Sequence, residues 1–411
     1  MSPLEAGAKS LLTARAVREA SQRMLTLALD GSLPEWTVDL EKLPETAELV
    51  EKLTRERFPR LNLPMHSRWR HFVFGGRDLW REIVAARAWP NPAARARAAF
   101  DLAITSVLLD AGAGATWRYM DPETEIIASR SEGLAFASLR WFESGGLSND
   151  KTDPLRADAS ALQRVDARSM RRAFQVTETN LLTGANERAA LLNRLGAAVE
   201  ARPDLFALQD SARPGGLFDV FARRAVAKEL SGAVILETLL EGLGPIWTGR
   251  PQLAGVSLGD CWPHPAFGSD AEPAGYVPLH KLSQWLAYSL IEPLQEAGFP
   301  VPGIDALTGL PEYRNGGLLI DMGVLVPRDP AQLRETHLVS SPFIVGMRAL
   351  TVALLDRLAP AVGVRLGLPQ DSLLLARVLE GGTWAAGRAI ARSKREGGGP
   401  PLQISSDGTV L

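Results

Sequence analysis

The sequence predicts a mainly α-helical protein, a multi-helix bundle with at most short strands. Apolar residues recur at three- and four-residue spacing along most of the 411 residues, in segments rich in Ala, Leu, Arg and Glu. Runs of β-branched residues are scarce. Strands are expected only at 37–40 and 126–128, and neither is long enough to define a sheet.

Local start and stop signals place the first helices. An apolar stripe runs from Leu11 to Leu27 and ends at Asp30-Gly31, a reasonable C-terminal cap. Pro44 then begins a helix that carries Glu45 in its first turn, as the helix macrodipole favours. Further helices are expected at 75–89, 91–112, 129–143, 158–176, 184–201, 216–241, 279–297, 311–322, 329–358 and 371–393.

The length of the chain suggests two domains or one large one. We expect an N-terminal helical part over 1–150 with a Gly- and aromatic-rich loop, and a C-terminal helical part over 151–395 that carries the active site. Residues 396–411 are expected to be a disordered tail. The stretch 242–276 is dense in Gly, Pro and Trp, which predicts a long irregular connection.

Composition narrows the functional classes. The chain carries 45 basic and 47 acidic residues, so no strong overall field favours nucleic acid or an anionic membrane. A single cysteine, Cys261, excludes an internal disulfide and a zinc site with two thiolate ligands. No apolar run approaches the length of a membrane span, and the N-terminus lacks a signal-peptide pattern. We expect a cytoplasmic protein that binds neither membrane nor nucleic acid.

Metal and cofactor motifs are missing from the sequence. No pair of histidines has helical ligand spacing joined to a third ligand, and neither Gly-rich phosphate-binding motif occurs. Ser283 and Ser340-Ser341 lack the surroundings of a nucleophile elbow. We therefore expect no metal and no obligatory cofactor.

The segment 278–325 is the candidate for chemistry. An amphipathic helix there runs into a turn rich in Pro and Gly that carries Asp305, Glu312, Tyr313 and Arg314, with Asp321 close behind. Ionisable groups in an apolar background are usually paired, exposed or retained for a ligand.

Glu312 follows Pro311 at a predicted helix start, where free N–H donors suit either a carboxylate or a bound anion. A first-turn Glu that only complements the macrodipole is the alternative. In the preceding helix, Lys281, Gln284 and Tyr288 share a polar face beside His280. A solvated surface is the alternative for that face.

Four motifs stand out along the chain, namely SRWRHFVFGGRDLW, LLDAGAGATWRYMDPET, RSEGLAFASLRWF and the run from Leu279 to Leu325. These motifs resemble those of the uracil catabolism protein 4 family. The last run is also similar to the queuosine salvage nucleosidases, through Lys281 and Gln284, Leu307-Thr308 and Glu312-Tyr313-Arg314. The second resemblance implies a helical fold similar to helix-hairpin-helix DNA glycosylases. That family carries Asp at the position of Glu312, and it differs after Tyr313-Arg314.

Together the two resemblances imply a role in uracil catabolism and hydrolysis of an N-glycosidic bond in ribosylurea or its 5′-phosphate, with release of urea. Glu312 would stabilise the oxocarbenium-like transition state, and Asp305 would be a second carboxylate. Lys281 and Arg314 would neutralise a phosphate. His280, Gln284, Tyr313 and Asp321 complete the expected substrate-binding set. The expected partners are a small ribosyl substrate and other enzymes of uracil degradation.

The family-like motifs of the N-terminal half supply further candidates for substrate binding, namely His71, Asp110, Trp117, Arg118 and Glu132. Asp110 could instead cap a loop, and Trp117 could be core. Three alternatives stay open for the whole protein. They are an amidohydrolase that attacks the ureido carbonyl, a helical scaffold without catalysis in which Glu312 would be exposed and unpaired, and a nucleic-acid glycosylase, which the near-neutral charge disfavours.

Overall fold

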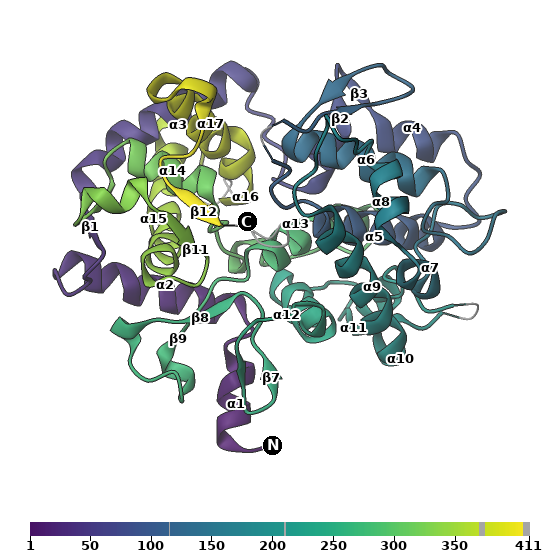
Figure 1. The fold of residues 1–411 in the computed structure, drawn as a ribbon, viewed down its shortest axis with the longest axis horizontal. Coiled ribbons are helices and arrows are strands. Elements are labelled where there is room, and N and C mark those ends of the chain that lie inside the picture. The colour runs from purple at the N-terminus through teal and green to yellow at the C-terminus, as the bar shows by residue number, and fades with distance from the viewer. Residues whose placement is uncertain (115, 209–210, 370–374, 406–411) are drawn as a thin grey trace. The chain divides into compact units, whose positions relative to one another are not determined.

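A computed structural model describes residues 1–114, 116–208, 211–369 and 375–405 (Figure 1). It confirms the expected mainly α fold, because helices dominate and the strands form only two-stranded pairs. None of the helices in these ranges is long and apolar enough to cross a membrane. The α-helices are α1 (Pro3–Ser10), α2 (Ala14–Leu29), α3 (Leu43–Arg57), α4 (Leu79–Ala85), α5 (Pro92–Leu108), α6 (Arg130–Glu143), α7 (Ala159–Gln163), α8 (Ala167–Ala173), α9 (Ala185–Ala201), α10 (Pro203–Phe206), α11 (Gly216–Arg224), α12 (Gly232–Leu243), α13 (Lys281–Glu296), α14 (Tyr313–Asp321), α15 (Pro342–Leu366), α16 (Leu375–Val378) and α17 (Trp384–Lys394).

The strands are short and pair locally, with two exceptions. β1 pairs antiparallel with β10, and β11 pairs parallel with β12, so these two ladders join distant parts of the chain. The strands are β1 (Trp36–Val38), β2 (Val73–Phe74), β3 (Arg77–Asp78), β4 (Tyr119–Met120), β5 (Ile127–Ala128), β6 (Gln252–Leu253), β7 (Val256–Ser257), β8 (Cys261–Pro263), β9 (Tyr276–Pro278), β10 (Leu325–Pro327), β11 (Thr336–Leu338) and β12 (Gln403–Ser405).

The chain divides into two compact units, and neither is a continuous stretch. Unit 1 comprises residues 1–66, 249–284 and 303–405, and unit 2 comprises 67–248 and 285–302. The division expected at residue 150 stays a prediction, because compactness in space does not show which stretches fold on their own.

Unit 1 is built around α15, which is buried over most of its length and packs against α2, α3 and α14. Trp36 anchors β1 to this helix. Its ring stacks on Phe343 at 4.4 Å between centroids, and its Nε1–H donates to the Phe343 carbonyl at 2.8 Å. Ser341 caps α15 and Pro342 occupies its first turn, which is why the helix begins there.

The prediction of a helix at 329–358 was wrong about where the helix starts, because α15 begins only at Pro342. A 3₁₀ turn at Pro330–Arg334 and strand β11 precede α15, because Pro330 and the Ser341-Pro342 start signal interrupt the helical pattern. The expected helix at 371–393 is α16 and α17 with a π-helical turn at Leu379–Thr383 between them. Its residues 371–374 lie outside the described residues, as do 406–411 of the expected disordered tail. Residues 396–405 form a 3₁₀ turn and β12 instead.

Unit 2 is built around α5, which packs against α6, α9 and α11. Asn91 caps α5 by accepting from the Ala94 N–H, and Pro92 follows it. At the other end, buried Arg188 donates to the Leu109 carbonyl at 3.1 Å and to the Ala111 carbonyl at 2.7 Å. The helices expected at 158–176 and 216–241 are each two helices in the structure. Asp166 caps the start of α8 inside the first range, and Ser231 caps the start of α12 inside the second.

In unit 2, Pro293 lies inside α13 and lacks an N–H, so the carbonyl of Ser289 four residues earlier loses its usual helical donor. Trp69 replaces that donor, because its Nε1–H donates to the Ser289 carbonyl at 2.7 Å. The Ser289 hydroxyl accepts from the Arg68 N–H at 2.9 Å. The proline therefore fixes where the 68–72 segment docks on α13.

Candidate functional site

An ion pair between buried Arg348 and partly buried Asp260 organises the candidate site in unit 1. Arg348 lies in α15 with no exposed surface, and its two terminal nitrogens donate to the two Asp260 carboxylate oxygens at 2.8 and 2.7 Å. Such a two-pronged geometry is among the strongest that arginine makes. Burial opposes ionisation of Asp260, but the Arg348 charge outweighs it and holds the pKa of Asp260 well below its ordinary value.

This ion pair fixes the starts of two helices. The Asp260 carbonyl accepts from the N–H groups of Leu279 and His280 at 2.9 and 3.0 Å, and its carboxylate accepts from the Lys281 N–H at 3.0 Å. Arg348 Nε donates to the carbonyl of Pro311, the residue before Glu312, at 3.0 Å. The first residue of α13 and the residues that start α14 are therefore tied to one ion pair.

Glu312 is the N-cap of α14. One carboxylate oxygen accepts from the Arg314 N–H at 3.0 Å and the other from the Asn315 N–H at 2.9 Å. The side chain is buried, with 6% of the residue exposed. The helix thus starts two residues later than expected, at Tyr313, and the carboxylate satisfies two of its free donors. Each oxygen keeps a further lone pair for another donor.

Gln284 joins the helix face to the loop that precedes α14. Its side-chain oxygen accepts from the Thr308 N–H at 3.0 Å, and its side-chain nitrogen donates to the Thr308 hydroxyl. Gln284 and Tyr288 are fully buried, whereas Lys281 is half-buried. The solvated surface considered for this face is therefore wrong for Gln284 and Tyr288.

His280 is held in a strained backbone conformation. Its φ of 46° lies in the left-handed region that side chains rarely adopt. Its Nε2 lies 3.0 Å from the Leu11 carbonyl oxygen, which can only accept, so Nε2 carries the proton. Burial lowers the pKa of His280, so the ring is neutral and Nδ1 holds a lone pair. Nδ1 is buried and has no hydrogen-bond partner among the described residues.

The remaining candidates of the C-terminal segment lie in different surroundings. Arg314 is buried and donates to the Gly398 carbonyl at 3.3 Å, and its guanidinium carbon lies 5.0 Å from the ring of half-buried Tyr313. Asp321 is paired with Arg395 through both oxygens. Asp321 therefore acts as a fixed partner of α17 rather than as a neighbour of Glu312.

Asp305 is exposed and lines a pocket of about 180 Å³ with Arg18 and Asp356. Asp356 lies eight residues after Arg348 on α15, which is about 12 Å along the helix axis. Arg18 donates to the Asp305 carbonyl at 3.1 Å and to the Asp356 carboxylate at 2.9 Å. The structure thus places Asp305 on the surface, beside a second ion pair.

The candidates of the N-terminal half lie in unit 2, and three of them gather around Arg68. This fully buried arginine pairs with Asp110 at 3.0 Å. Burial lowers the pKa of Arg68, and the charges of Asp110 and Glu132 oppose that shift. The rings of His71 and Trp285 meet edge to face at 5.6 Å, and the Arg68 guanidinium lies 5.5 Å from Trp285. These residues form a second cluster of charged and aromatic groups.

Trp117 and Arg118 make other contacts than the cluster around Arg68. Trp117 is fully buried and its Nε1–H donates to the Phe174 carbonyl at 3.0 Å, so it serves as core. Arg118 is exposed, and its guanidinium donates to the Trp117 carbonyl at 2.9 Å. Asn180 holds the Arg118 backbone through its N–H and its carbonyl.

Sequence reasoning missed Asp260 and Arg348. A signal for Arg348 was available, since it is a lone charge within the apolar run from Pro342 to Leu355. Nothing local indicates that Asp260, in the irregular connection, is its partner. Among the described residues, no group of three or more His, Cys, Asp and Glu side chains could hold a metal ion.

The depressed pKa of Asp260 predicts an acid-dependent loss of stability. The unfolded chain binds the proton more tightly than the folded protein, so the contribution is complete above about pH 4 and is lost as pH falls toward the folded pKa. Asp260→Asn should melt lower at pH 7 and show a flatter dependence of melting temperature on pH below about 4. Asp270→Asn changes an exposed aspartate of the same unit, and as the control it should follow the wild type. Parallel curves for Asp260→Asn and wild type would contradict this assignment.

A family model described as "Protein of unknown function (DUF1688)" matches residues 10–411, which include every residue of both clusters. The chain belongs to the DUF1688 family. Among the relatives of this DUF1688 protein, the protein urg3 of Schizosaccharomyces pombe is 37% identical over 98% of each chain. Uracil catabolism protein 4 of Lachancea kluyveri is 35% identical over 93% of each chain. The expected family resemblance is therefore confirmed for this DUF1688 protein.

Proposed function

We propose that this protein acts in uracil catabolism as a hydrolase of the N-glycosidic bond in ribosylurea or its 5′-phosphate. The pathway rests on the name of the relative from Lachancea kluyveri, and the reaction rests on the resemblance of Lys281, Gln284 and Glu312 to the queuosine salvage nucleosidases. The observation that carries the proposal is the Asp260–Arg348 ion pair, because it ties the starts of α13 and α14 together. Both helices begin at residues of the nucleosidase-like pattern.

In the proposed reaction, water attacks C1′ of the ribose while the bond from C1′ to the urea nitrogen breaks. The water proton passes to the leaving urea, so the products are ribose, or its 5′-phosphate, and urea. The Glu312 carboxylate stabilises the positive charge that develops at C1′. Two backbone N–H groups already fix its orientation, so little reorganisation is needed when substrate binds.

The other residues bind and position the substrate. Lys281 and Arg314 supply positive charge for a 5′-phosphate. The Nδ1 of His280, which has no hydrogen-bond partner among the described residues, can accept a hydrogen bond from a sugar hydroxyl. Asp305 is exposed beside Arg18, so we assign it no part in the attack. For Asp305 we keep only a proposed contact with ribose hydroxyls.

Product analysis tests the reaction and separates it from the alternatives. Purified protein is incubated with synthetic ribosylurea and with its 5′-phosphate, and urea, ammonia and free sugar are measured. Glycosidic cleavage gives equal amounts of urea and ribose or ribose phosphate. Ammonia without urea would instead indicate attack on the ureido carbonyl. Binding without turnover would indicate a helical scaffold without catalysis. That hypothesis expects Glu312 to be exposed and unpaired, whereas the structure shows it buried and hydrogen-bonded.

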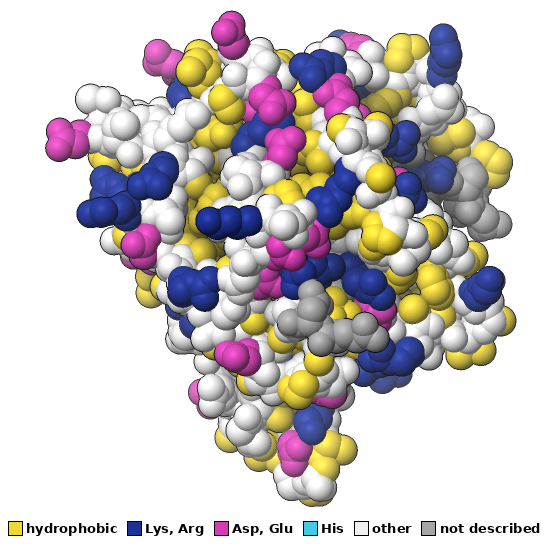
Figure 2. Space-filling model, turned by 90° about the vertical axis from the view of Figure 1, so that its right-hand side faces the viewer, with side chains coloured by type: hydrophobic (Ala, Val, Ile, Leu, Met, Phe, Trp, Pro, Cys, Tyr) yellow, Lys and Arg dark blue, Asp and Glu magenta, His cyan; other side chains and the backbone are white. Residues whose placement is uncertain are grey.

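The hypothesis of a nucleic-acid glycosylase gains no support from the molecular face drawn in Figure 2. On the face in Figure 2, Lys and Arg side chains are interspersed with Asp and Glu and form no wide basic area. The overall balance of 45 basic and 47 acidic residues agrees with this. Binding to a phosphate backbone depends on a concentrated basic surface.

A further inference from the structure

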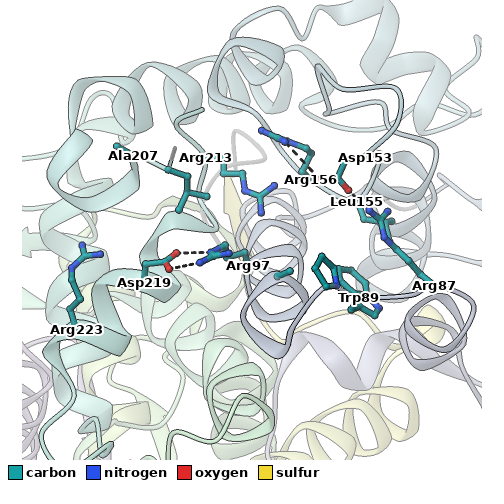
Figure 3. A pocket seen from close by; sticks show the side chains of 13 residues that line it. Arg87, Trp89, Arg97, Asp153, Leu155, Arg156, Ala207, Arg213, Asp219 and Arg223 are labelled. Carbon is teal, nitrogen blue, oxygen red and sulfur yellow. Dashed lines mark hydrogen bonds and ion pairs between the residues drawn. The ribbon is translucent and has the colours of Figure 1, made fainter. Parts of the chain in front are cut away.

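A pocket of about 530 Å³ opens within unit 2, among α5, α11 and the segments that carry Trp89 and Leu155 (Figure 3). The proposed glycosidic cleavage uses none of its residues. Its lining holds two aspartates, Asp153 and Asp219. The lining also holds five arginines, namely Arg87, Arg97, Arg156, Arg213 and Arg223.

Pairing with aspartates accounts for part of this positive charge. Arg87 pairs with Asp153, and Arg97 holds both oxygens of Asp219 at 2.7 and 2.6 Å (Figure 3). Arg223 is exposed, and no acidic side chain of the described residues pairs with it. The lining therefore keeps a surplus of positive charge.

Arg156 and Arg213 are built into the wall of the pocket. Each is more than nine-tenths buried. Arg156 pairs with buried Asp158 at 2.6 Å. In Figure 3 the Arg213 guanidinium lies in the space between Arg97 and Arg156. A buried guanidinium is costly unless its charge and donors are satisfied.

The only acidic group paired with Arg213 among the described residues is Asp101. The Arg213 Nε lies 3.4 Å from an Asp101 oxygen, but without a hydrogen bond between them. Burial raises the pKa of Asp101 to about 7, even though Arg213 acts in the opposite direction. Among the described residues, the acidic group paired with Arg213 is thus one whose ionisation burial opposes, and no hydrogen bond joins the two side chains. An anion in the pocket would compensate the Arg213 charge more fully.

The rest of the lining is apolar. Trp89, Leu155 and Leu208 contribute to it, and Trp89 is held by a hydrogen bond from its Nε1–H to the Val84 carbonyl at 3.0 Å. The volume is in the range of pockets that take small organic ligands. Such a pocket suits a ligand with a charged end and a planar or apolar end.

We propose that this pocket binds a small phosphate ester. Its phosphate would lie between Arg213, Arg97 and Arg223, because the planar donor fork of arginine matches phosphate oxygens. Its planar group would rest against Trp89. The proposal is independent of the proposed glycosidic cleavage and concerns a separate group of residues in unit 2.

Calorimetric titration of the full-length protein tests this proposal, with adenosine 5′-monophosphate as the probe. Inorganic phosphate and adenosine each supply one half of that probe. Adenosine monophosphate should bind at least about tenfold more tightly than either half, and its affinity should fall as salt is raised. Equal affinity for adenosine and its monophosphate would overturn the proposal, since the arginines would then contribute nothing.

Variants locate the bound probe. Arg223→Ala changes only an exposed side chain and should weaken binding by about fivefold, and Arg213→Met should weaken it more strongly. Arg172→Ala removes an exposed arginine of α8 outside the pocket and should bind like the wild type. Lys281→Ala, in the candidate site of unit 1, should also bind normally. Wild-type affinity in Arg223→Ala and Arg213→Met, or a loss confined to Lys281→Ala, would refute the assignment. Melting curves show whether Arg213→Met is folded, and Arg223→Ala decides the question if it is not.

Discussion

Glu312→Gln is expected to lower the rate of urea release from ribosylurea by about 100-fold or more, which is the scale for losing one well-placed charged group in an active site. The amide keeps the size of the side chain but removes the negative charge that faces C1′ in the proposed reaction. Steady-state assays of urea release with the purified variant measure this effect. Turnover close to that of the wild type would remove Glu312 from the mechanism.

The same change also weakens a helix cap, so stability must be separated from catalysis. The glutamine has one accepting oxygen for the two N–H groups of Arg314 and Asn315, and the loss should cost about 1 kcal/mol. Thr13→Ala is the matched control, because Thr13 caps α2 in the same unit and accepts from the Ala16 N–H. It should lose similar stability and keep full activity. Glu312→Asp keeps a capping carboxylate and should retain more activity than Glu312→Gln.

Arg348→Met is expected to lower the free energy of unfolding by about 3–5 kcal/mol, because it leaves the Asp260 carboxylate without its buried partner. It also frees the Pro311 carbonyl and so loosens the start of α14. Guanidinium unfolding followed by circular dichroism measures the loss. We expect activity to fall with it, since Glu312 follows Pro311 directly.

The same helix offers a matched control. Arg365 lies on α15 and pairs with Glu48 and Glu51 at a more exposed position, with 35% of its side chain accessible. Arg365→Met should cost about 1 kcal/mol or less. A second variant, Arg348→Met combined with Asp260→Leu, removes both charges and should regain part of the stability. A loss for Arg348→Met no greater than that for Arg365→Met would show that the Asp260–Arg348 pair does not organise this unit.

Local sequence signals predicted much of the secondary structure. The helices at 279–297 and 184–201 match α13 and α9 closely, because each has apolar residues at helical spacing over its length. The predictions failed where start signals lie inside a longer helical pattern, as at Asp166, Ser231 and Ser341. A capping side chain acts on one or two backbone donors, and periodicity averaged over many residues does not register it.

The candidate site was predicted less completely. Periodicity placed Gln284 and Tyr288 on one polar face of a helix, but only packing decides that this face is buried. Likewise, the position of Glu312 after Pro311 indicated a helix start. Only the folded chain shows that both of its oxygens cap the helix.

By itself the sequence determined the helical class, most helix positions and the family, because these depend on local periodicity, caps and motifs that can be read along the chain. Only the tertiary structure decided the pairing of Asp260 with Arg348, which are 88 residues apart, and the gathering of arginines from distant segments into one pocket of unit 2. The reason is physical. Which charges meet depends on how helices pack against one another, and that packing is a property of the whole chain rather than of any segment.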